Sequence, residues 1–246
     1  MARMGGSTRV KRSMAPAFWR IPRKKARFSI RVQGGPHRKD RSYALMVLLR
    51  DILHLVKTAR EGDAVLQGER VLVDGKPRHE PGFPIGLMDV VEIPSIGRIY
   101  RLLPHPRYTL YPVTVSEAEK SLKLCLVGRK VTVAGGKVRL GMHDGRSLLM
   151  GGDTKIREGD ACLIDLASDK VLASYGLQKG SQALVTGGEK AGLTGVVQEI
   201  KPGTMTRSAM VVLAMATTST ELPIHLVMPI GEGKIPVTVS AESQTA

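Results

Sequence analysis

Positive charge is concentrated at the front of this chain, and this asymmetry constrains its fold more than any other feature. Residues 1–60 contain 16 of the 37 lysines and arginines but only two acidic residues, Asp40 and Asp51, a net charge of +14. The remaining residues, 61–246, carry a net charge of only +1. A segment with so much charge of one sign repels itself, so we expect a polyanionic partner, with nucleic acid favoured over an acidic membrane.

Residues 1–41 show no helical or strand periodicity and contain three prolines. Such a segment cannot bury enough apolar surface to offset its loss of conformational entropy, so we expect an extended arm that folds against a partner. Phe18, Trp19 and Phe28 lie among its basic residues. Aromatic rings beside guanidinium groups can stack on unpaired bases. The alternative, that the rings attach the arm to the protein body, stays open at this stage.

Two helices and a hairpin are predicted after the arm. Apolar residues recur at three- and four-residue spacing from Ser42 to Val56, which predicts a helix. Thr58 and Glu61 have the spacing of a capping box, so a second helix should begin there. Asp74-Gly75 between apolar runs predicts a two-residue hairpin turn.

The rest of the chain is predicted to be mostly strands. A strand at 88–93 completes the first unit, and a second capping box at Ser116 and Glu119 predicts one more short helix. Short runs rich in β-branched residues, separated by glycine turns, indicate a small barrel or sandwich. The runs expected as strands are 108–115, 129–133, 137–140, 161–166, 170–173, 210–216 and 223–228.

The stretch at 185–197, VTGGEKAGLTGVV, nearly reads as a phosphate-binding loop. Leu193, however, stands where the motif G-x-x-x-x-G-K-[ST] requires lysine. The run from Val196 to Ile200 that follows has strand length and is rich in β-branched residues, whereas the motif needs a helix there. The stretch therefore predicts a glycine-shaped hairpin rather than a nucleotide site.

Other residues capable of chemistry do not form a recognisable site. The six histidines lack metal-ligand spacing, and Ser147 and Thr194 lack the surroundings of a nucleophilic serine. Cys125 and Cys162 cannot form a disulfide framework, which indicates a reducing compartment. No apolar run reaches the ~18 residues of a membrane span. We therefore expect no catalytic residue, metal, cofactor, membrane partner or small-molecule substrate.

The unit from Tyr43 to Ile93 resembles the S4-type RNA-binding domain. In that domain two packed helices precede a small sheet that carries the pattern V-x-V-[ND]-G-K, which reads VLVDGK at 71–76 here. Met88-Asp89 stands where the domain usually has Gly-Asp before its last strand. The pattern occurs in ribosomal proteins, pseudouridine synthases and some synthetases, so alone it indicates RNA binding.

A wider set of motifs resembles the archaeal and eukaryotic small-subunit ribosomal protein S4e family over nearly the full chain. In order, they are APAFW at 15–19, GPHR at 35–38, DGKPR at 74–78, PIGLMDV at 84–90, KLC at 123–125 and HDGR at 143–146. Residues 217–246 match least well, and a C-terminal region shorter than in eukaryotic members favours an archaeal type. In that family, residues 185–197 are similar to a KOW motif, a β-hairpin whose glycines let RNA approach the backbone.

The resemblance implies an α+β fold that is mostly β. Its expected parts are a basic arm at 1–41, an S4-like RNA-binding domain at 42–95, a central β-rich domain at 96–175, a KOW-type (SH3-like) small barrel at 176–216, and C-terminal strands and a tail at 217–246.

The resemblance also implies a structural constituent of the small ribosomal subunit, located on the ribosome in the cytoplasm. Its expected partners are small-subunit ribosomal RNA and neighbouring ribosomal proteins, and its mechanism is neutralisation of phosphate repulsion where RNA helices meet. Two alternatives stay open: an RNA-modifying enzyme that docks through the S4-like module, or a KOW-containing translation or transcription factor. The expected RNA contacts are Arg3, Arg9, Lys11, Arg12, Trp19, Arg20, Arg23, Lys24, Lys25, Arg27, Arg31, His37, Arg38, Lys39, Arg41, Lys57, Arg60, Lys76, Arg78 and Lys190.

Overall fold

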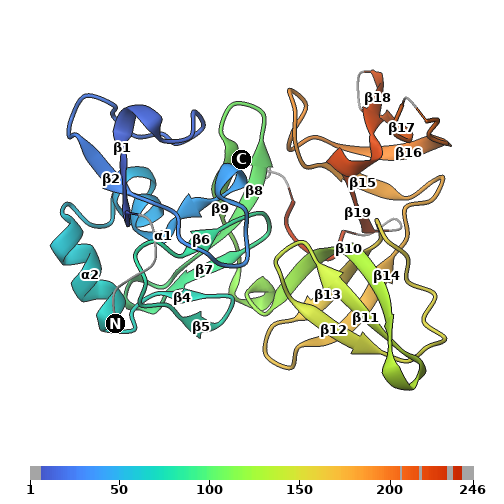
Figure 1. Ribbon diagram of the computed structural model, residues 1–246, viewed down its shortest axis with the longest axis horizontal. Helices are drawn as coiled ribbons and strands as arrows, with labels where there is room; N and C mark the ends of the chain where they lie inside the picture. The colour runs from blue at the N-terminus through green and yellow to red at the C-terminus, as the bar shows by residue number, and fades with distance from the viewer. Residues whose placement is uncertain (1–6, 206, 216–217, 232–234, 240–246) are drawn as a thin grey trace.

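Three five-stranded antiparallel sheets carry the fold of this protein, with short helices and two small strand pairs against the first sheet (Figure 1). The computed structural model describes residues 7–205, 207–215, 218–231 and 235–239. Within these residues strand clearly exceeds helix, in agreement with the mostly β fold that the sequence indicates. No helix in the described part of the chain is long and apolar enough to cross a membrane.

The first sheet has the strand order β5-β4-β7-β8-β9. The predicted hairpin turn is present, because Asp74 and Gly75 have φ values of 51° and 73°, as a turn with two left-handed residues requires. The strand predicted at 88–93 is present as β7. The bounds are β4 Leu72–Val73, β5 Lys76–Pro77, β7 Val90–Ile93, β8 Arg98–His105 and β9 Thr109–Thr114, with the short helix η4 Pro94–Ile96 between β7 and β8.

The two predicted helices are present, but the first is shorter than expected. Its residues form α1 Leu45–Val47 and the π-turn η3 Leu48–Ile52, where the sequence predicts a helix over 42–56. Tyr43–Ala44 instead forms strand β3, which pairs with β6 Pro84–Ile85. The second helix, α2 Ala59–Gln67, begins at the predicted capping box of Thr58 and Glu61.

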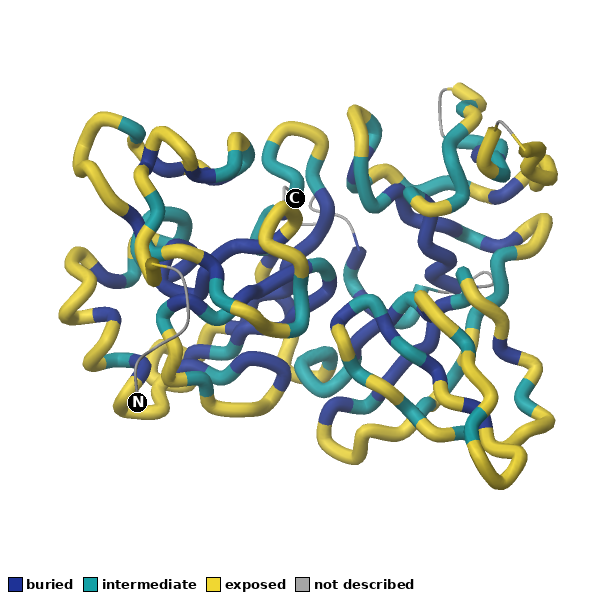
Figure 2. The backbone as a smooth tube through the Cα atoms, viewed as in Figure 1, coloured by how far each residue is buried: buried dark blue, intermediate teal, exposed yellow. Residues whose placement is uncertain are grey.

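The arm is folded against the body over residues 7–41, which corrects the expectation of an extended segment. Strand β1 Arg9–Lys11 pairs with β2 Phe28–Ile30, and the short helices η1 Arg12–Met14 and η2 Lys39–Arg41 flank them. Trp19 is 3% exposed and packs with Tyr43, and its indole Nε1 donates to the Ser42 carbonyl at 3.1 Å. These contacts join residues more than 20 positions apart, so no local periodicity reveals them. Figure 2 shows buried stretches between the exposed ones in this part of the chain.

The second and third sheets follow in sequence. The second has the order β12-β11-β10-β13-β14, and the third has the order β18-β17-β16-β15-β19. Strand β10 pairs with both β11 and β13, and β13 pairs with β14. The bounds are β10 Leu122–Val133, β11 Lys137–Met142, β12 Ser147–Met150, β13 Ala161–Asp165, β14 Lys170–Tyr175, β15 Gln182–Val185, β16 Thr194–Lys201, β17 Met210–Ala214, β18 Ser219–Pro223 and β19 Val227–Gly231, with the short helix η6 Ala134–Gly136.

Two predictions in these regions are wrong. Residues 223–228 do not form one strand, because η7 Ile224–Leu226 separates β18 from β19. Ser116 does not cap the short helix η5 Glu117–Glu119 through its side chain. The Glu119 carboxylate instead accepts hydrogen bonds from the fully buried Arg101 guanidinium at 3.0 Å and from the Thr238 amide at 2.8 Å. This long-range ion pair uses the carboxylate that the local motif would need.

One apolar core joins the three sheets. It contains Leu103 from the first sheet, Leu124 and Leu163 from the second, and Leu184 and Met228 from the third. Val237 and Val239, close to the end of the described chain, are buried in the same core. The three sheets therefore bury apolar surface against one another.

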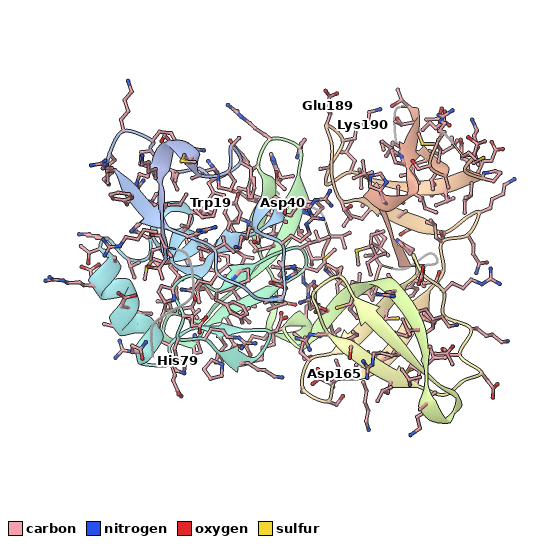
Figure 3. The ribbon with its side chains drawn as sticks, viewed as in Figure 1. Trp19, Asp40, His79, Asp165, Glu189 and Lys190 are labelled. Carbon is pink, nitrogen blue, oxygen red and sulfur yellow. The ribbon has the colours of Figure 1, made fainter. Side chains whose placement is uncertain are left out.

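The predicted glycine hairpin at 185–197 contacts the end of β8 through Gly192. Strand β16 follows the loop where a phosphate-binding loop would need a helix, so the strand predicted after the loop is confirmed. Gly192 has a φ of +87°, and a Cβ at this position would lie 2.5 Å from the Pro104 carbonyl oxygen. Figure 3 labels Glu189 and Lys190 on this loop.

We expect Gly192→Ala to destabilise the protein more than Gly188→Ala. Both residues have a left-handed φ, so alanine costs about 1–2 kcal/mol at either position. At Gly188 the nearest contact to a new Cβ is a Leu226 side-chain carbon at 3.9 Å, whereas Gly192 faces backbone and adds about 1–3 kcal/mol of overpacking. Urea unfolding of the two variants measures the difference, and equal losses would contradict a tight loop–turn contact.

Candidate nucleic-acid interface

A basic groove runs between the arm and the start of α2, with a volume of about 1020 Å³. We call it the basic groove. The cations that line it are Arg12, Arg20 and Lys25 from the arm, Arg50 from η3, and Lys57 before α2. Four of these five, all except Arg50, are RNA contacts that the sequence predicts. The fold thus brings together cations that are up to 45 positions apart in the sequence.

The local structure of the two short helices shapes one wall of the basic groove. The chain leaves η3 through His54, whose φ of 53° turns the backbone away from the helix axis. It enters α2 through the capping box, in which the Glu61 carboxylate accepts from the Lys57 amide at 2.8 Å. Because the Glu61 carboxylate already accepts from this backbone amide, an anion in the groove would contact this wall through side chains, chiefly that of Lys57.

The lining carboxylate of the basic groove, Asp51, is neutralised internally. Its Oδ2 accepts from Arg50 Nη2 at 2.6 Å, and its Oδ1 lies 3.8 Å from Arg12 Nη2. Arg20, Lys25 and Lys57 are exposed and retain their positive charge toward solvent. The groove therefore presents net positive charge over a concave surface, which suits a phosphodiester backbone.

Most of the other predicted contacts are accessible on the surface. Arg78 is half-buried, and its guanidinium lies 4.5 Å from the centroid of the Phe83 ring. Arg38 pairs with Asp40 at 3.3 Å, and both side chains are exposed. The exposed members of the predicted set outside the groove are Arg9, Lys11, Lys24, Arg27, Arg31, Arg38, Lys39, Arg41, Arg60 and Lys76.

Four predicted contacts are corrected because their side chains serve the fold. Arg12 is 5% exposed and donates to the Pro22 and Phe28 carbonyls, while Arg23 donates to the Arg12, Ala15 and Pro16 carbonyls. Trp19 lies in the core of the arm, which favours the alternative that this ring attaches the arm to the body (Figure 3). The His37 side chain is 6% exposed, and its Nε2 lies 2.9 Å from an Asp89 carboxylate oxygen.

Two further predicted contacts have a different status. Lys190 is half-buried, and its ammonium donates to the Thr220 hydroxyl of β18. It is therefore at least partly engaged within the third sheet. Arg3 lies outside the described residues. Of the aromatic residues in the arm, Phe28 is 45% exposed and Phe18 packs edge-on against Tyr43.

Sequence reasoning missed Arg50 and a set of residues at the turn between β8 and β9. Arg50 falls on the polar side of the predicted helix, which is a signal that was available. The turn residues, in contrast, gave no signal in the sequence. Arg20 of the arm lies over the Tyr108 ring, 4.2 Å from its centroid. No sequence spacing indicates a contact across 88 positions.

A buried ion cluster connects the first two sheets. The ammonium of Lys123 in β10 is fully buried and bonds to Asp74 and Asp89 at 2.6 Å each and to Asp144 at 3.0 Å. Arg146 bonds to Asp74 and Asp144 at 3.0 Å each. Residues from both sheets thus form one network of two cations and three carboxylates, which ties the first sheet to the second.

The pKa values in the buried ion cluster favour the charged forms. Burial alone would raise the pKa of Asp89, but Lys123 and His37 lower it well below its ordinary value. Burial likewise opposes charge on Lys123, yet Asp89, Asp74 and Asp144 hold its pKa well above the ordinary value. These groups remain ionised at neutral pH, as structural ion pairs do.

Cys125, His143 and Asp144 place three possible metal-ligand atoms within 4.8 Å of one another. His143 Nδ1 accepts from the Leu126 amide, so its Nε2 carries the proton and donates to the Leu87 carbonyl at 3.1 Å. Burial raises the pKa of the Cys125 thiol, and Asp144 is bonded to Lys123. The donor atoms are committed to protons and cations, so this group does not fit a metal ion.

The fold and the basic groove define a class: basic proteins of antiparallel sheets with a concave cationic surface. Two family models match the chain, the RS4NT (NUC023) domain over residues 4–40 and the Ribosomal family S4e over residues 96–171. Relatives at 33–38% identity over most of the chain carry the same family name. The chain belongs to the ribosomal protein S4e family.

Individual relatives match over most of their length. The small ribosomal subunit protein eS4 of Korarchaeum cryptofilum is 38% identical, over 81% of this chain and 85% of the relative. That of Methanothermobacter thermautotrophicus is 37% identical, over 85% of each chain. The crystal structure of the 30S ribosomal protein S4e from Thermoplasma acidophilum superposes with a TM-score of 0.70 at 30% identity, covering 80% of this chain and 98% of that chain.

Proposed function

We propose that this protein is a structural constituent of the small ribosomal subunit and stabilises folded ribosomal RNA. The observation that carries the proposal is the basic groove, in which cations from the arm and from the helical wall converge on one concave surface. Family membership supports the proposal, because the named relatives are small-subunit proteins. The mechanism is electrostatic: lysine and arginine replace the counterions of closely approaching phosphates.

The parts of the chain have different roles in this proposal. Residues 42–95 act as the S4-like unit, with Lys57 and Arg60 on the RNA backbone and Lys76 at the hairpin. Residues 176–216 act as the KOW-type unit beside it. Neighbouring ribosomal proteins contact the remaining surface, and the protein acts in the ribosome without catalysis, cofactor or small-molecule substrate.

The salt dependence of RNA affinity tests the electrostatic mechanism. For about six phosphate contacts, the affinity of the full chain for ribosomal RNA should fall by roughly 10³-fold between 50 and 200 mM salt. Filter binding or fluorescence anisotropy measures this slope. An affinity that is independent of salt would exclude phosphate neutralisation as the basis of binding.

A further inference from the structure

The turn between β8 and β9 carries a compact stack of aromatic and cationic side chains, which we call the turn stack. The His105 and Tyr108 rings are stacked with centroids 4.8 Å apart, and the Tyr111 ring lies 5.6 Å from His105. Arg20 lies over the Tyr108 ring at 4.2 Å, and Arg107 lies at 5.7 Å from the same centroid. The three rings are half-buried and Arg107 is exposed, so the stack is open to solvent on part of its surface.

The backbone of this turn is strained and firmly anchored. Thr109 has a φ of 58°, which is a rare conformation for a β-branched residue and costs on the order of 1–3 kcal/mol. The Tyr43 hydroxyl lies 3.0 and 3.1 Å from the Tyr108 and Leu110 carbonyls, and Leu110 is buried in the core. These inner contacts fix the turn, so the outer rings of the turn stack are not needed to hold it.

His105 is held in its neutral form. Its Nδ1 accepts from the Arg107 amide at 3.1 Å. Burial and the nearby Arg20 and Arg107 guanidinium groups lower its pKa below the ordinary value. A neutral ring flanked by two guanidinium groups offers π faces and positive charge at one place, the combination on which nucleic-acid bases stack.

The turn stack is continuous with the basic groove through Arg20, which lines the groove and covers Tyr108. Gly192, in the loop before β16, lies against the backbone of Pro104 and His105 at the end of β8. An RNA backbone in the groove would therefore pass directly beside the rings. The strained backbone of the turn, its two guanidinium groups and its continuity with the basic groove favour RNA over a protein as the partner of the turn stack.

We propose that the turn stack binds an unpaired nucleotide of RNA by stacking, next to a phosphate backbone held in the basic groove. This inference rests on the proposed RNA-binding function and adds the kind of nucleotide that is recognised. Because stacking accepts every base, the site reads single-strandedness rather than sequence.

The test compares two RNA hairpins with the same stem, one with a single bulged adenosine and one fully paired, using the full chain at about 0.15 M salt. The wild type should prefer the bulged hairpin. Tyr108→Ala should lower affinity for the bulged hairpin by about 5- to 150-fold and change the paired one by less than about twofold. Tyr108→Phe, which keeps the ring, should retain the preference.

Ultraviolet cross-linking followed by mass spectrometry gives a second readout that does not depend on a variant. The bulged adenosine should cross-link to the peptide containing 105–111.

Three outcomes would contradict the inference. If Tyr108→Ala lowered the affinity for both hairpins equally, or lowered it for neither, the inference would be overturned while RNA binding stayed intact. If the protein bound neither hairpin in a salt-dependent way, the proposed function would be overturned as well. Release of Tyr108→Ala from subunits with unchanged RNA affinity would assign the stack to a protein partner and overturn the inference.

Discussion

Replacing two exposed cations that line the basic groove and one directly beside it, Lys25→Gln, Lys57→Gln and Arg60→Gln, is expected to lower affinity for ribosomal RNA on the order of 100-fold at about 0.15 M salt. Lys25 and Lys57 line the groove, and Arg60 follows its last lining residue, Ala59. Each lost phosphate contact should reduce the salt slope by about 0.9, so the plot of log affinity against log salt should become shallower by about 2.7. Affinity titrations at several salt concentrations measure both quantities.

A matched variant separates the groove from net charge. Lys155, Lys170 and Lys179 are exposed in and around the second sheet, far in sequence from the groove. Changing these three to glutamine removes the same formal charge. The control should lose much less affinity and keep nearly the wild-type salt slope. If the two triple variants behaved alike, binding would depend on overall charge and the groove would have no special role.

Lys123→Met is expected to destabilise the protein by about 3–5 kcal/mol, because it leaves buried carboxylates without their cation. Asp74, Asp89 and Asp144 all lie within 3.0 Å of the Lys123 ammonium, which is fully buried. Lys120→Met is the matched control: its side chain is 41% exposed and its ammonium pairs with Glu92 at 3.3 Å, so its loss should cost less than about 1 kcal/mol. Urea unfolding measures both, and similar small losses would contradict a structural role for the cluster.

The pH dependence of stability provides an independent readout of the buried ion cluster. The pKa values of Asp89 and Asp144 are lowered in the folded state. Their stabilising contribution is therefore complete above the unfolded Asp value of about 3.9 and is lost as the pH falls toward the folded values. The wild type should lose unfolding free energy below about pH 4–5. Lys123→Met should lose less over that range, because its carboxylates no longer favour ionisation.

Local sequence signals predicted local structure well in this chain. The Thr58–Glu61 capping box starts α2, and Asp74-Gly75 forms the hairpin turn, because each motif satisfies its own backbone groups within a few residues. The missing lysine and the β-branched run at 196–200 correctly indicated a strand, which spans 194–201. The Ser116–Glu119 motif failed because the buried Arg101 takes the same carboxylate.

The arm illustrates what the sequence could not show. Its composition indicates disorder, yet Trp19, Ile21 and Val32 are buried with Tyr43 and Leu110. Their contacts depend on the placement of distant strands, so neither periodicity nor charge reports them. The same limit applies to Arg12 and Arg23, whose guanidinium groups donate to backbone carbonyls. The sequence alone does not distinguish such an arginine from one that binds phosphate.

The interface was therefore predictable in its chemistry and only in part in its geometry. The charge asymmetry located the part of the chain that carries the cations of the basic groove, and Arg20, Lys25 and Lys57, which the sequence predicts as RNA contacts, are exposed there. Their convergence on one groove, and the approach of Arg20 to Tyr108, depend on how the arm folds across the first sheet.

Co-sedimentation of the full chain with small ribosomal subunits, in salt high enough to screen exposed charge pairs, tests the central claim most directly. A constituent held by many buried phosphate contacts should stay with the small subunit through the gradient, in constant proportion to the ribosomal RNA. Complete release into the free fraction, while other proteins of the small subunit remain bound, would contradict the account and identify a factor that binds transiently.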